Sequence, residues 1–308
     1  MSVIQKLTIG IKTRKNLIIE SKPIKLESKS QDGATVVRKK YKIFVENDFD
    51  LISPIDNFNE IFKKFQFNSQ LQKNITSLNY TLPTPSQMQA IPLLMGNVTS
   101  DLFLKLWNHL EEKNVLLTAP TGSGKTASYA IPIIKMCLNS KQDIHSNYTY
   151  TSPFALIFVP TRELSYQIYQ QFILLSEDLK IKLACLDKLP KKEKFRKFDV
   201  IISTPARFAL HLDCKKWYSR ICWIIIDECD KLFENIDSSN ANLVALNKIQ
   251  EQVKNDLINY MLLSATYSHI IDDWATKIVG SVVKNINSNE NEKSERFMKS
   301  KLKLQTKS

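Results

Sequence analysis

The sequence predicts an α/β fold in which helices cover both faces of a mostly parallel β-sheet. Short runs rich in apolar and β-branched residues alternate along the chain with longer amphipathic stretches, which is the pattern of repeated β–α–β units. These runs are continuously apolar, as expected for strands that are buried on both faces. Six strands are expected: Val115–Thr118, Ala155–Val159, Lys182–Leu186, Val200–Ser203, Trp223–Ile226 and Met261–Leu263.

Helices are expected before and between these strands. Pro83 and Pro85 interrupt the chain, and Ser86 is expected to cap the helix that follows them. Phenylalanines between Phe58 and Phe67 give an apolar face at the start of the folded region. The expected helices are Gln70–Leu78, Gln87–Met95, Asp101–Glu112, Ala127–Leu138, Leu164–Ser176 and Leu243–Leu257.

Length and charge bound the domain organisation. The 308 residues, 43% of them hydrophobic, suffice for one large domain or two small ones. We expect a folded domain over residues 54–283, a basic arm without fixed structure over 1–53 and a polar disordered tail over 284–308. The net charge is +12, and residues 1–45 carry nine Lys and two Arg against three acidic residues. Such an excess of positive charge favours nucleic acid as a partner. A solvated, disordered arm explains the positive charge of residues 1–45 equally well.

Cysteine spacing and hydropathy exclude other classes. The five cysteines form no C-x-x-C pair and have no histidine at a metal-ligand spacing, so the sequence indicates neither a zinc site nor a disulfide framework. No apolar run approaches the roughly 20 residues needed to cross a bilayer. We therefore expect an intracellular protein without a membrane partner.

The segment Ala119–Thr126, APTGSGKT, is a P-loop placed directly after a strand and before a helix. Backbone N–H groups of such a loop surround the phosphates of a nucleotide, and the helix N-terminus adds positive potential. Lys125 is expected to reach the β- and γ-phosphates, and the Thr126 hydroxyl to bind Mg²⁺. The predicted nucleotide-binding residues of the loop are Pro120, Thr121, Gly122, Ser123, Gly124, Lys125 and Thr126.

A second motif lies at the end of the strand Trp223–Ile226, which continues into Asp227-Glu228-Cys229-Asp230. A buried strand that delivers carboxylates to its tip suits a metal site beside a phosphate. Asp227 is expected to hold Mg²⁺, partly through water, and Glu228 to act as the general base toward the attacking water. Together with Lys125, these two acids are the predicted catalytic residues.

With these motifs the chain resembles the DEAD-box RNA helicases, over about Phe58–Ile278. The resemblance implies the RecA-like P-loop NTPase domain that forms the N-terminal, ATP-binding lobe of such an enzyme, with ATP and Mg²⁺ as cofactors and RNA as partner. Pro83-Thr84-Pro85-Ser86-Gln87 resembles the family's Q motif, so Gln87 is the predicted adenine reader. Phe58 is the predicted aromatic that stacks on the base, with Phe62 as competitor, and core packing of both is the alternative.

Two further segments, Pro160–Leu164 and Ser203–Arg207, resemble the family's RNA-backbone motifs and follow expected strands. A Thr hydroxyl, an Arg and a helix N-terminus bind phosphates without reading bases. The predicted RNA-binding residues are Thr161, Arg162, Glu163, Thr204, Pro205 and Arg207. Ser264-Ala265-Thr266 matches the motif that links hydrolysis to strand separation, and the predicted coupling residues are Ser264, Thr266 and Asp230, joined by hydrogen bonds.

Some positions depart from the family's usual spelling. Cys229 replaces an Ala, as in the DECD group that resembles mRNA-export helicases, and is expected to be buried and not catalytic because no base lies nearby. The segment Phe198–Pro205, the lack of paired glycines after Leu183–Lys188 and the 29-residue spacing from Phe58 to Gln87 resemble instead the branch that acts in small-subunit ribosomal RNA processing. That branch implies ribosome biogenesis and a location in the nucleus, in the nucleolus.

The family's second RecA-like lobe, which supplies arginine fingers, has no room between Gly280 and Ser308. Because arginine fingers contribute factors of about 10³–10⁵, we expect the chain alone to bind ATP but hydrolyse it weakly, and to need the second lobe or a cofactor protein for full activity. A non-catalytic half-helicase that binds ATP and RNA is the alternative. A metabolic P-loop kinase would leave Gln87, Arg162 and Arg207 unexplained. The segment Gly96–Lys113 is expected to be an extra packed helix or a partner-binding insertion.

Overall fold

The computed structural model describes residues 31–45, 52–96, 114–142, 152–189, 198–212, 220–234, 240–253, 258–266, 271 and 284–287. The chain divides into two compact units, Met1–Gly33 and Ala34–Ser308, and the strands and the site described below belong to the second. The expected helix Asp101–Glu112 lies outside the described residues. Within them, no helix has the length and apolar character of a membrane span.

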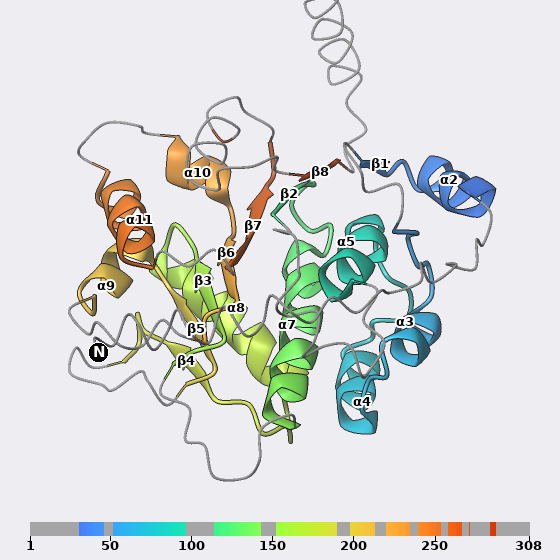
Figure 1. The fold of residues 1–308 in the computed structure, drawn as a ribbon, viewed down its shortest axis with the longest axis horizontal. Coiled ribbons are helices and arrows are strands. Elements are labelled where there is room, and N and C mark those ends of the chain that lie inside the picture. Colours follow the sequence, from blue (N-terminus) through green and yellow to red (C-terminus); the bar gives the residue numbers. More distant parts are fainter. Residues whose placement is uncertain are drawn as a thin grey trace, which may run out of the picture. The chain divides into compact units, whose positions relative to one another are not determined.

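The described strands form one eight-stranded sheet in the order β1-β8-β2-β7-β6-β3-β5-β4 (Figure 1). Only the pair β1 and β8 is antiparallel, and every other neighbouring pair is parallel. All six predicted strands are present. The bounds are β1 Phe44–Val45, β2 Val115–Thr118, β3 Ala155–Phe158, β4 Leu183–Cys185, β5 Val200–Ser203, β6 Trp223–Ile226, β7 Asn259–Ser264 and β8 Lys284–Asn287.

The strands β1 and β8 extend the sheet beyond the expected limits of 54 and 283. Strand β8 pairs with β2 from Lys284 to Asn287, so the first residues of the expected disordered tail belong to the sheet. On the N-terminal side, Arg38 donates hydrogen bonds to Gln89 Oε1 (3.1 Å) and to the carbonyl oxygen of Ile52 (3.0 Å). These long-range contacts explain why part of the basic arm is ordered, and a reading of local composition does not show them.

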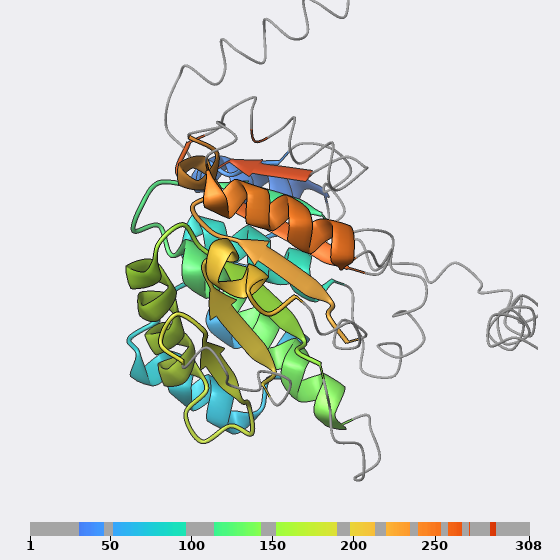
Figure 2. The same ribbon diagram turned by 90° about the vertical axis from the view of Figure 1, so that its left-hand side faces the viewer.

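Helices lie on both faces of the sheet, as predicted (Figure 2). One face packs on α5, α7 and α8 through alternate strand residues such as Leu117, Ile157 and Ile225. The intervening residues, such as Leu156 and Ile224, face α9, α10 and α11. The helices are α2 Gln31–Lys40, α3 Phe58–Lys64, α4 Ser69–Ser77, α5 Pro85–Met95, α7 Lys125–Gln142, α8 Arg162–Leu175, α9 Pro205–Ala209, α10 Cys229–Phe233 and α11 Ala241–Gln252.

Several helix ends differ from the expectations: α7 runs from Lys125 to Gln142 and α8 begins at Arg162, and at α5 and α11 the capping residue explains the difference. Helix α5 is capped by Thr84 and not by Ser86: the Thr84 side chain accepts from the Gln87 N–H, and the Gln87 side chain accepts from the Thr84 N–H. This reciprocal capping box places Pro85 in the first turn, where its missing N–H does no harm. Helix α11 begins at Ala241, two residues early, because Asn240 accepts from the N–H groups of Asn242 and Leu243.

Candidate nucleotide and RNA-backbone site

The P-loop connects β2 to α7 at the carboxyl edge of the sheet. Gly122 and Gly124 have φ values of +77° and +79°, in the left-handed region that side chains rarely adopt. At Gly124 an added Cβ would also lie 2.5 Å from Gln87 Nε2, whereas at Gly122 it would meet nothing within 4 Å. Backbone conformation therefore favours glycine at both positions, and at Gly124 a side chain would also displace the Gln87 amide.

Lys125 turns back onto the loop that carries it. Its Nζ donates to the carbonyl oxygens of Ala119 (2.6 Å) and Pro120 (3.1 Å). Burial lowers the pKa of the Lys125 ammonium, while the nearby carboxylates, first among them Asp227, act in the opposite direction. The Ser123 hydroxyl is buried and has no hydrogen-bond partner among the described residues. The loop thus offers a partly desolvated cation and an unpaired hydroxyl, both suited to phosphate oxygens.

Gln87 joins the segment before α5 to the P-loop. Its Nε2 donates to the Gly124 carbonyl oxygen at 3.2 Å, and Thr84 Oγ1 donates to the Ser123 carbonyl oxygen at 2.7 Å. Gln87 is only 3% exposed. The predicted adenine reader therefore lies beside the P-loop, where Gly124 and Thr84 engage the two polar atoms of its amide.

The two aromatic candidates for base stacking lie in the core. Phe58 and Phe62 are 3% and 5% exposed, and their ring centroids are 5.8 Å apart. Phe58 also stacks on Tyr80. Because stacking on a base requires an open ring face, this burial favours the core alternative over Phe58 as the stacker.

Asp227 ends β6 in a buried position. Its Oδ2 accepts from the Tyr129 hydroxyl at 2.9 Å, and its Oδ1 accepts from the Glu228 N–H at 2.9 Å. Burial raises the pKa of Asp227 to about 6, against the hydrogen bonds from Tyr129 and Glu228. Glu228 has a left-handed backbone (φ 51°), and its Oε2 pairs with Lys231 Nζ at 2.8 Å. A strained non-glycine residue at a strand tip is typical of functional sites.

The donor set here suits Mg²⁺. Tyr129, 0% exposed, interacts with the Thr126 side chain as well as with Asp227, so one buried hydroxyl joins the two predicted metal ligands. Mg²⁺ prefers hard oxygen donors. A bound cation would also offset the energetic cost of burying the charged Asp227 carboxylate. No cluster of three His, Cys, Asp or Glu side chains with metal-binding geometry occurs among the described residues. Sequence patterns gave no reason to single out Tyr129.

The hydrogen bonds expected between Asp230 and the segment after β7 are present. Asp230 Oδ2 accepts from the N–H groups of Ala265 (3.2 Å) and Thr266 (3.3 Å) and from Thr266 Oγ1 (3.2 Å). The Ser264 carbonyl oxygen in turn accepts from the Ala119 N–H at 3.0 Å, at the start of the P-loop. Cys229 is fully buried, and burial raises the pKa of its thiol, so it is unsuited to act as a nucleophile.

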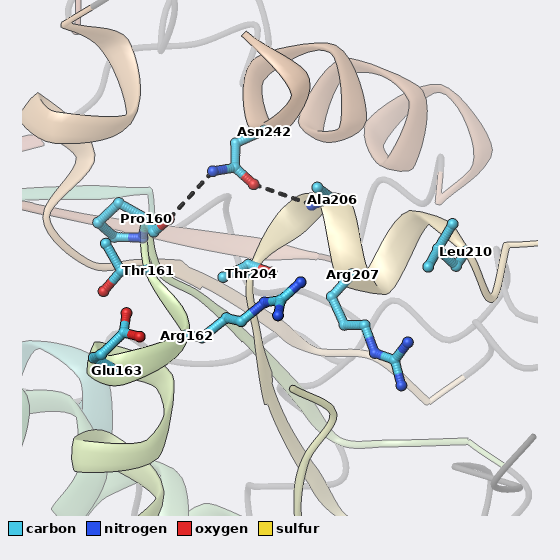
Figure 3. A pocket seen from close by; sticks show the side chains of 9 residues that line it. All are labelled: Pro160, Thr161, Arg162, Glu163, Thr204, Ala206, Arg207, Leu210 and Asn242. Carbon is cyan, nitrogen blue, oxygen red and sulfur yellow. Dashed lines mark hydrogen bonds between the residues drawn. The ribbon is translucent and has the colours of Figure 1, made fainter. Parts of the chain in front are cut away.

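A pocket of about 520 Å³ opens beside these motifs (Figure 3). Five of the six predicted RNA-binding residues line it, all from the segments that follow β3 and β5. Arg162 is exposed and, within the described ranges, no hydrogen bond or ion pair engages its guanidinium. Pro205 is buried and does not line the pocket. The lining residues are Pro160, Thr161, Arg162, Glu163, Thr204, Ala206, Arg207, Leu210 and Asn242.

Two of the predicted phosphate-binding groups already have internal partners. Thr204 donates from its N–H and from Oγ1 to the Asp187 carboxylate, both at 2.9 Å. Arg207 donates to the carbonyl oxygens of Leu186 (3.1 Å) and Leu189 (2.7 Å). Both residues therefore hold the turn after β4, while Arg162 and the N-terminal turn of α8 face the pocket.

Asn242, in the first turn of α11, joins the two loops that form the pocket. Its Nδ2 donates to the Pro160 carbonyl oxygen and its Oδ1 accepts from the Ala206 N–H, both at 3.2 Å (Figure 3). A lone Asn near a helix start carries no signal in the sequence, because its partners lie 82 and 36 residues away. The amide fixes the spacing between the loops that carry Arg162 and Arg207.

Strand order brings the two halves of the site together. The P-loop, the segment after β7 and the acidic strand end follow β2, β7 and β6, which are neighbours in the sheet. The pocket loops follow β3 and β5, and β3 lies directly beside β6. Since parallel strands end at one edge, the nucleotide motifs and the pocket form a continuous band along that edge.

Comparison with known proteins agrees with this geometry. A model of the DEAD/DEAH box helicase family matches residues 84–274. The chain belongs to this family. The helicase domain is 31% identical over 281 residues to a bovine (Bos taurus) protein called "Probable ATP-dependent RNA helicase DDX52", a match that covers 88% of this chain and 42% of that protein. It is 28% identical to the ATP-dependent RNA helicase ROK1 of Lodderomyces elongisporus, over 82% of this chain and 42% of the relative.

Solved structures show the same fold. A DEAD box protein from Methanococcus jannaschii aligns with a TM-score of 0.57 at 24% identity, covering 77% of this chain and 57% of that one. The yeast DEAD-box splicing factor Prp28 aligns with a TM-score of 0.65 at 19% identity, covering 87% and 57%. The predicted RecA-like α/β class is thereby confirmed. The helicase domain spans about 40% of the length of the curated relatives.

Proposed function

We propose that this chain is the ATP-binding lobe of an ATP-dependent RNA helicase of the DEAD-box type, and that it binds ATP with Mg²⁺ and the RNA backbone at one sheet edge. The observation that carries the proposal is the shared edge: the P-loop, Asp227 and the Arg162 pocket follow neighbouring parallel strands. Gln87 reads adenine, and Thr126 and Asp227 hold the metal. Mg²⁺, when bound, neutralises phosphate charge during hydrolysis.

The chain's own residues have separate tasks in this proposal. Lys125 exchanges its loop carbonyl partners for phosphate oxygens, and Glu228 accepts a proton from the attacking water after leaving Lys231. Arg162, Thr161 and the N-terminal turn of α8 bind RNA phosphates, with Glu163 beside them. Asp230 transmits the state of the nucleotide to the segment Ser264–Thr266 through its hydrogen bonds with Ala265 and Thr266. Full turnover depends on a second RecA-like lobe or a cofactor protein.

The segment Phe198–Pro205 and the spacing from Phe58 to Gln87 support the ribosomal RNA branch over the mRNA-export group, and the relatives named DDX52 and ROK1 match 82–88% of this chain. We accordingly assign the chain a role in small-subunit ribosomal RNA processing, in the nucleolus. Cross-linking in cells followed by sequencing of the bound RNA tests this assignment. Recovery of pre-ribosomal RNA is expected, and recovery of messenger RNA alone would contradict it.

RNA-stimulated ATP hydrolysis tests the enzymatic proposal. The chain is compared with Lys125→Ala and Glu228→Gln, with and without oligouridylate. We expect weak hydrolysis that RNA stimulates and that both substitutions abolish. Turnover equal to that of both variants, with ATP and RNA still bound, would instead identify a non-catalytic ATP- and RNA-binding half-helicase. GTP bound as tightly as ATP would contradict the role of Gln87.

A further inference from the structure

An exposed tyrosine lies on α8 one turn beyond the pocket. Tyr166 follows Arg162 by four residues, so both side chains lie on the same face of the helix. Tyr166 is 41% exposed, and Lys188 Nζ lies 4.6 Å from its ring centroid. Surface aromatics with adjacent cations are the means by which proteins bind single-stranded nucleic acid independently of sequence.

The turn that carries Lys188 is fixed by residues of the pocket. Arg207, which lines the pocket, holds this turn at the carbonyl oxygens of Leu186 and Leu189, one residue to either side of the Asp187–Lys188 pair. Asp187 itself is bound by Thr204. Lys188 therefore stands at a fixed position between the wall of the pocket and Tyr166.

The surface beside the pocket is continuous in chemistry as well as in space. Arg162 and Lys188 are both exposed, Lys188 lies against the Tyr166 ring, and Arg162 lies one helical turn before it, while the Asp187 carboxylate accepts hydrogen bonds from Thr204. A polyanion with flat bases matches an exposed ring with one cation against it and a second cation one helical turn away. The exposed apolar residues Ile173 and Leu174 lie about two turns further along α8 and belong to a different stretch of the helix.

We propose that the RNA-binding surface continues from the pocket across Tyr166 and Lys188. The Tyr166 ring stacks on the base or ribose of the next nucleotide, and Lys188 binds a phosphate. This inference rests on the proposed function, because it extends the backbone pocket by one further contact. The platform accepts any base, since every base has a flat face.

RNA binding by the full chain, with Mg²⁺ and a non-hydrolysable ATP analogue, tests the platform. The probes are a labelled oligouridylate just long enough to fill the pocket and one longer by about four nucleotides. Tyr166→Ala is expected to weaken binding of the longer RNA about 5- to 30-fold and to leave the shorter one unchanged. Tyr166→Phe, which keeps the ring, should bind like the parent chain. Lys188→Ala should lower the slope of log affinity against log salt by about 0.7 for the longer RNA.

Matched controls lie elsewhere on the chain. Ile173→Ala removes an exposed apolar side chain from the same helix, and Lys64→Ala removes one charge and a cation–π contact with Phe65. Both should bind the longer RNA like the parent. If Tyr166→Ala proves unstable, the salt dependence of RNA binding by Lys188→Ala tests the inference: an unchanged slope for the longer RNA would overturn it.

Equal affinity of Tyr166→Ala and the parent for the longer RNA would overturn the inference and leave this face to a protein partner. Equal loss in Tyr166→Phe and Tyr166→Ala would overturn the stacking role. Failure of the proposed function has a different signature: the parent chain binds neither RNA, or Arg162→Ala binds both as well as the parent does.

Discussion

The side chain of Gln87 donates a hydrogen bond from Nε2 to the carbonyl oxygen of Gly124, which lies 3.2 Å away and 37 residues further along the chain. This contact places the predicted adenine reader against the predicted phosphate loop. It also explains why the position opposite Gln87 is a glycine, because a Cβ there would lie 2.5 Å from the amide nitrogen. The conformation of the P-loop and the position of the Gln87 side chain therefore depend on each other.

Substitution of Gly124 by Ala tests this contact. The added Cβ collides with Gln87 and Thr84 and must also adopt a φ of +79°. We expect ATP affinity to fall by tenfold or more, on the order of 1.4 kcal/mol, and unfolding to occur at a lower temperature. Isothermal titration with ATP analogues and thermal denaturation measure the two effects.

Gly122→Ala is the matched control, because it has a similar φ of +77° but open space at the Cβ position. It should lose only the backbone contribution, about 1 kcal/mol of stability. The same loss in both variants would show that backbone strain alone, and not the contact with Gln87, governs the loop.

Asp227→Asn separates stability from metal binding. Burial raises the pKa of Asp227 from 3.8 to about 6. Above pH 6, the ionised carboxylate therefore lowers the stability of the folded state by about 3 kcal/mol. The folded state holds the proton longer than the unfolded state, and this contribution therefore makes stability fall as pH rises from about 4 to about 6. Without nucleotide, Asp227→Asn should unfold at a higher temperature than the parent at pH 7.5.

The stability difference between Asp227→Asn and the parent should shrink as pH falls from about 6 toward 4 and vanish below the unfolded-state pKa of 3.8, where the parent carboxyl is protonated in both states. The variant should at the same time lose its Mg²⁺-dependent affinity for ATP. Equal melting temperatures at pH 7.5 would argue against a buried, penalised carboxylate at this position.

Tyr129→Phe tests the buried hydroxyl that sequence patterns did not single out. The Tyr129 hydrogen bond lowers the pKa of Asp227, so its removal should raise that pKa further. Mg²⁺–ATP binding requires the ionised carboxylate, and its pH midpoint should therefore move upward. Affinity should fall several-fold at pH 6.5 and recover at pH 8.5. A loss that is the same at both pH values would point to general damage to packing instead.

Features set by neighbouring residues in the chain could be predicted from the sequence, and features set by distant partners could not. The six central strands were predictable because runs such as Ile224-Ile225-Ile226 are continuously apolar, and the motifs follow such runs directly. Their meeting at one edge follows from parallel strands. Long-range partners were not predictable: Tyr129 meets Asp227 across 98 residues, and β8 pairs with β2. The burial of Phe58 likewise depends on Tyr80, which lies 22 residues further along the chain and which no local pattern pairs with it.

Asn242 provides the last test, because its amide joins the two loops of the RNA pocket. Asn242→Ala removes both hydrogen bonds, to the Pro160 carbonyl oxygen and from the Ala206 N–H. At about 1 kcal/mol for each neutral hydrogen bond, RNA affinity should fall about 5- to 30-fold. ATP affinity should not change, since α11 packs on α9 and α10 and the P-loop follows β2 on the other side of β7 and β6. Fluorescence anisotropy with oligouridylate measures the effect.

Asn247→Ala makes the same substitution at an exposed position of the same helix, so it controls for helix propensity. Asn242→Gln keeps both the donor and the acceptor and should recover part of the lost affinity, which a purely space-filling role would not predict. If Asn242→Ala lowers the melting temperature but binds RNA as tightly as Asn247→Ala does, the amide stabilises α11 without setting the pocket. If RNA affinity falls while ATP affinity holds, the spacing of the two loops is what the pocket requires.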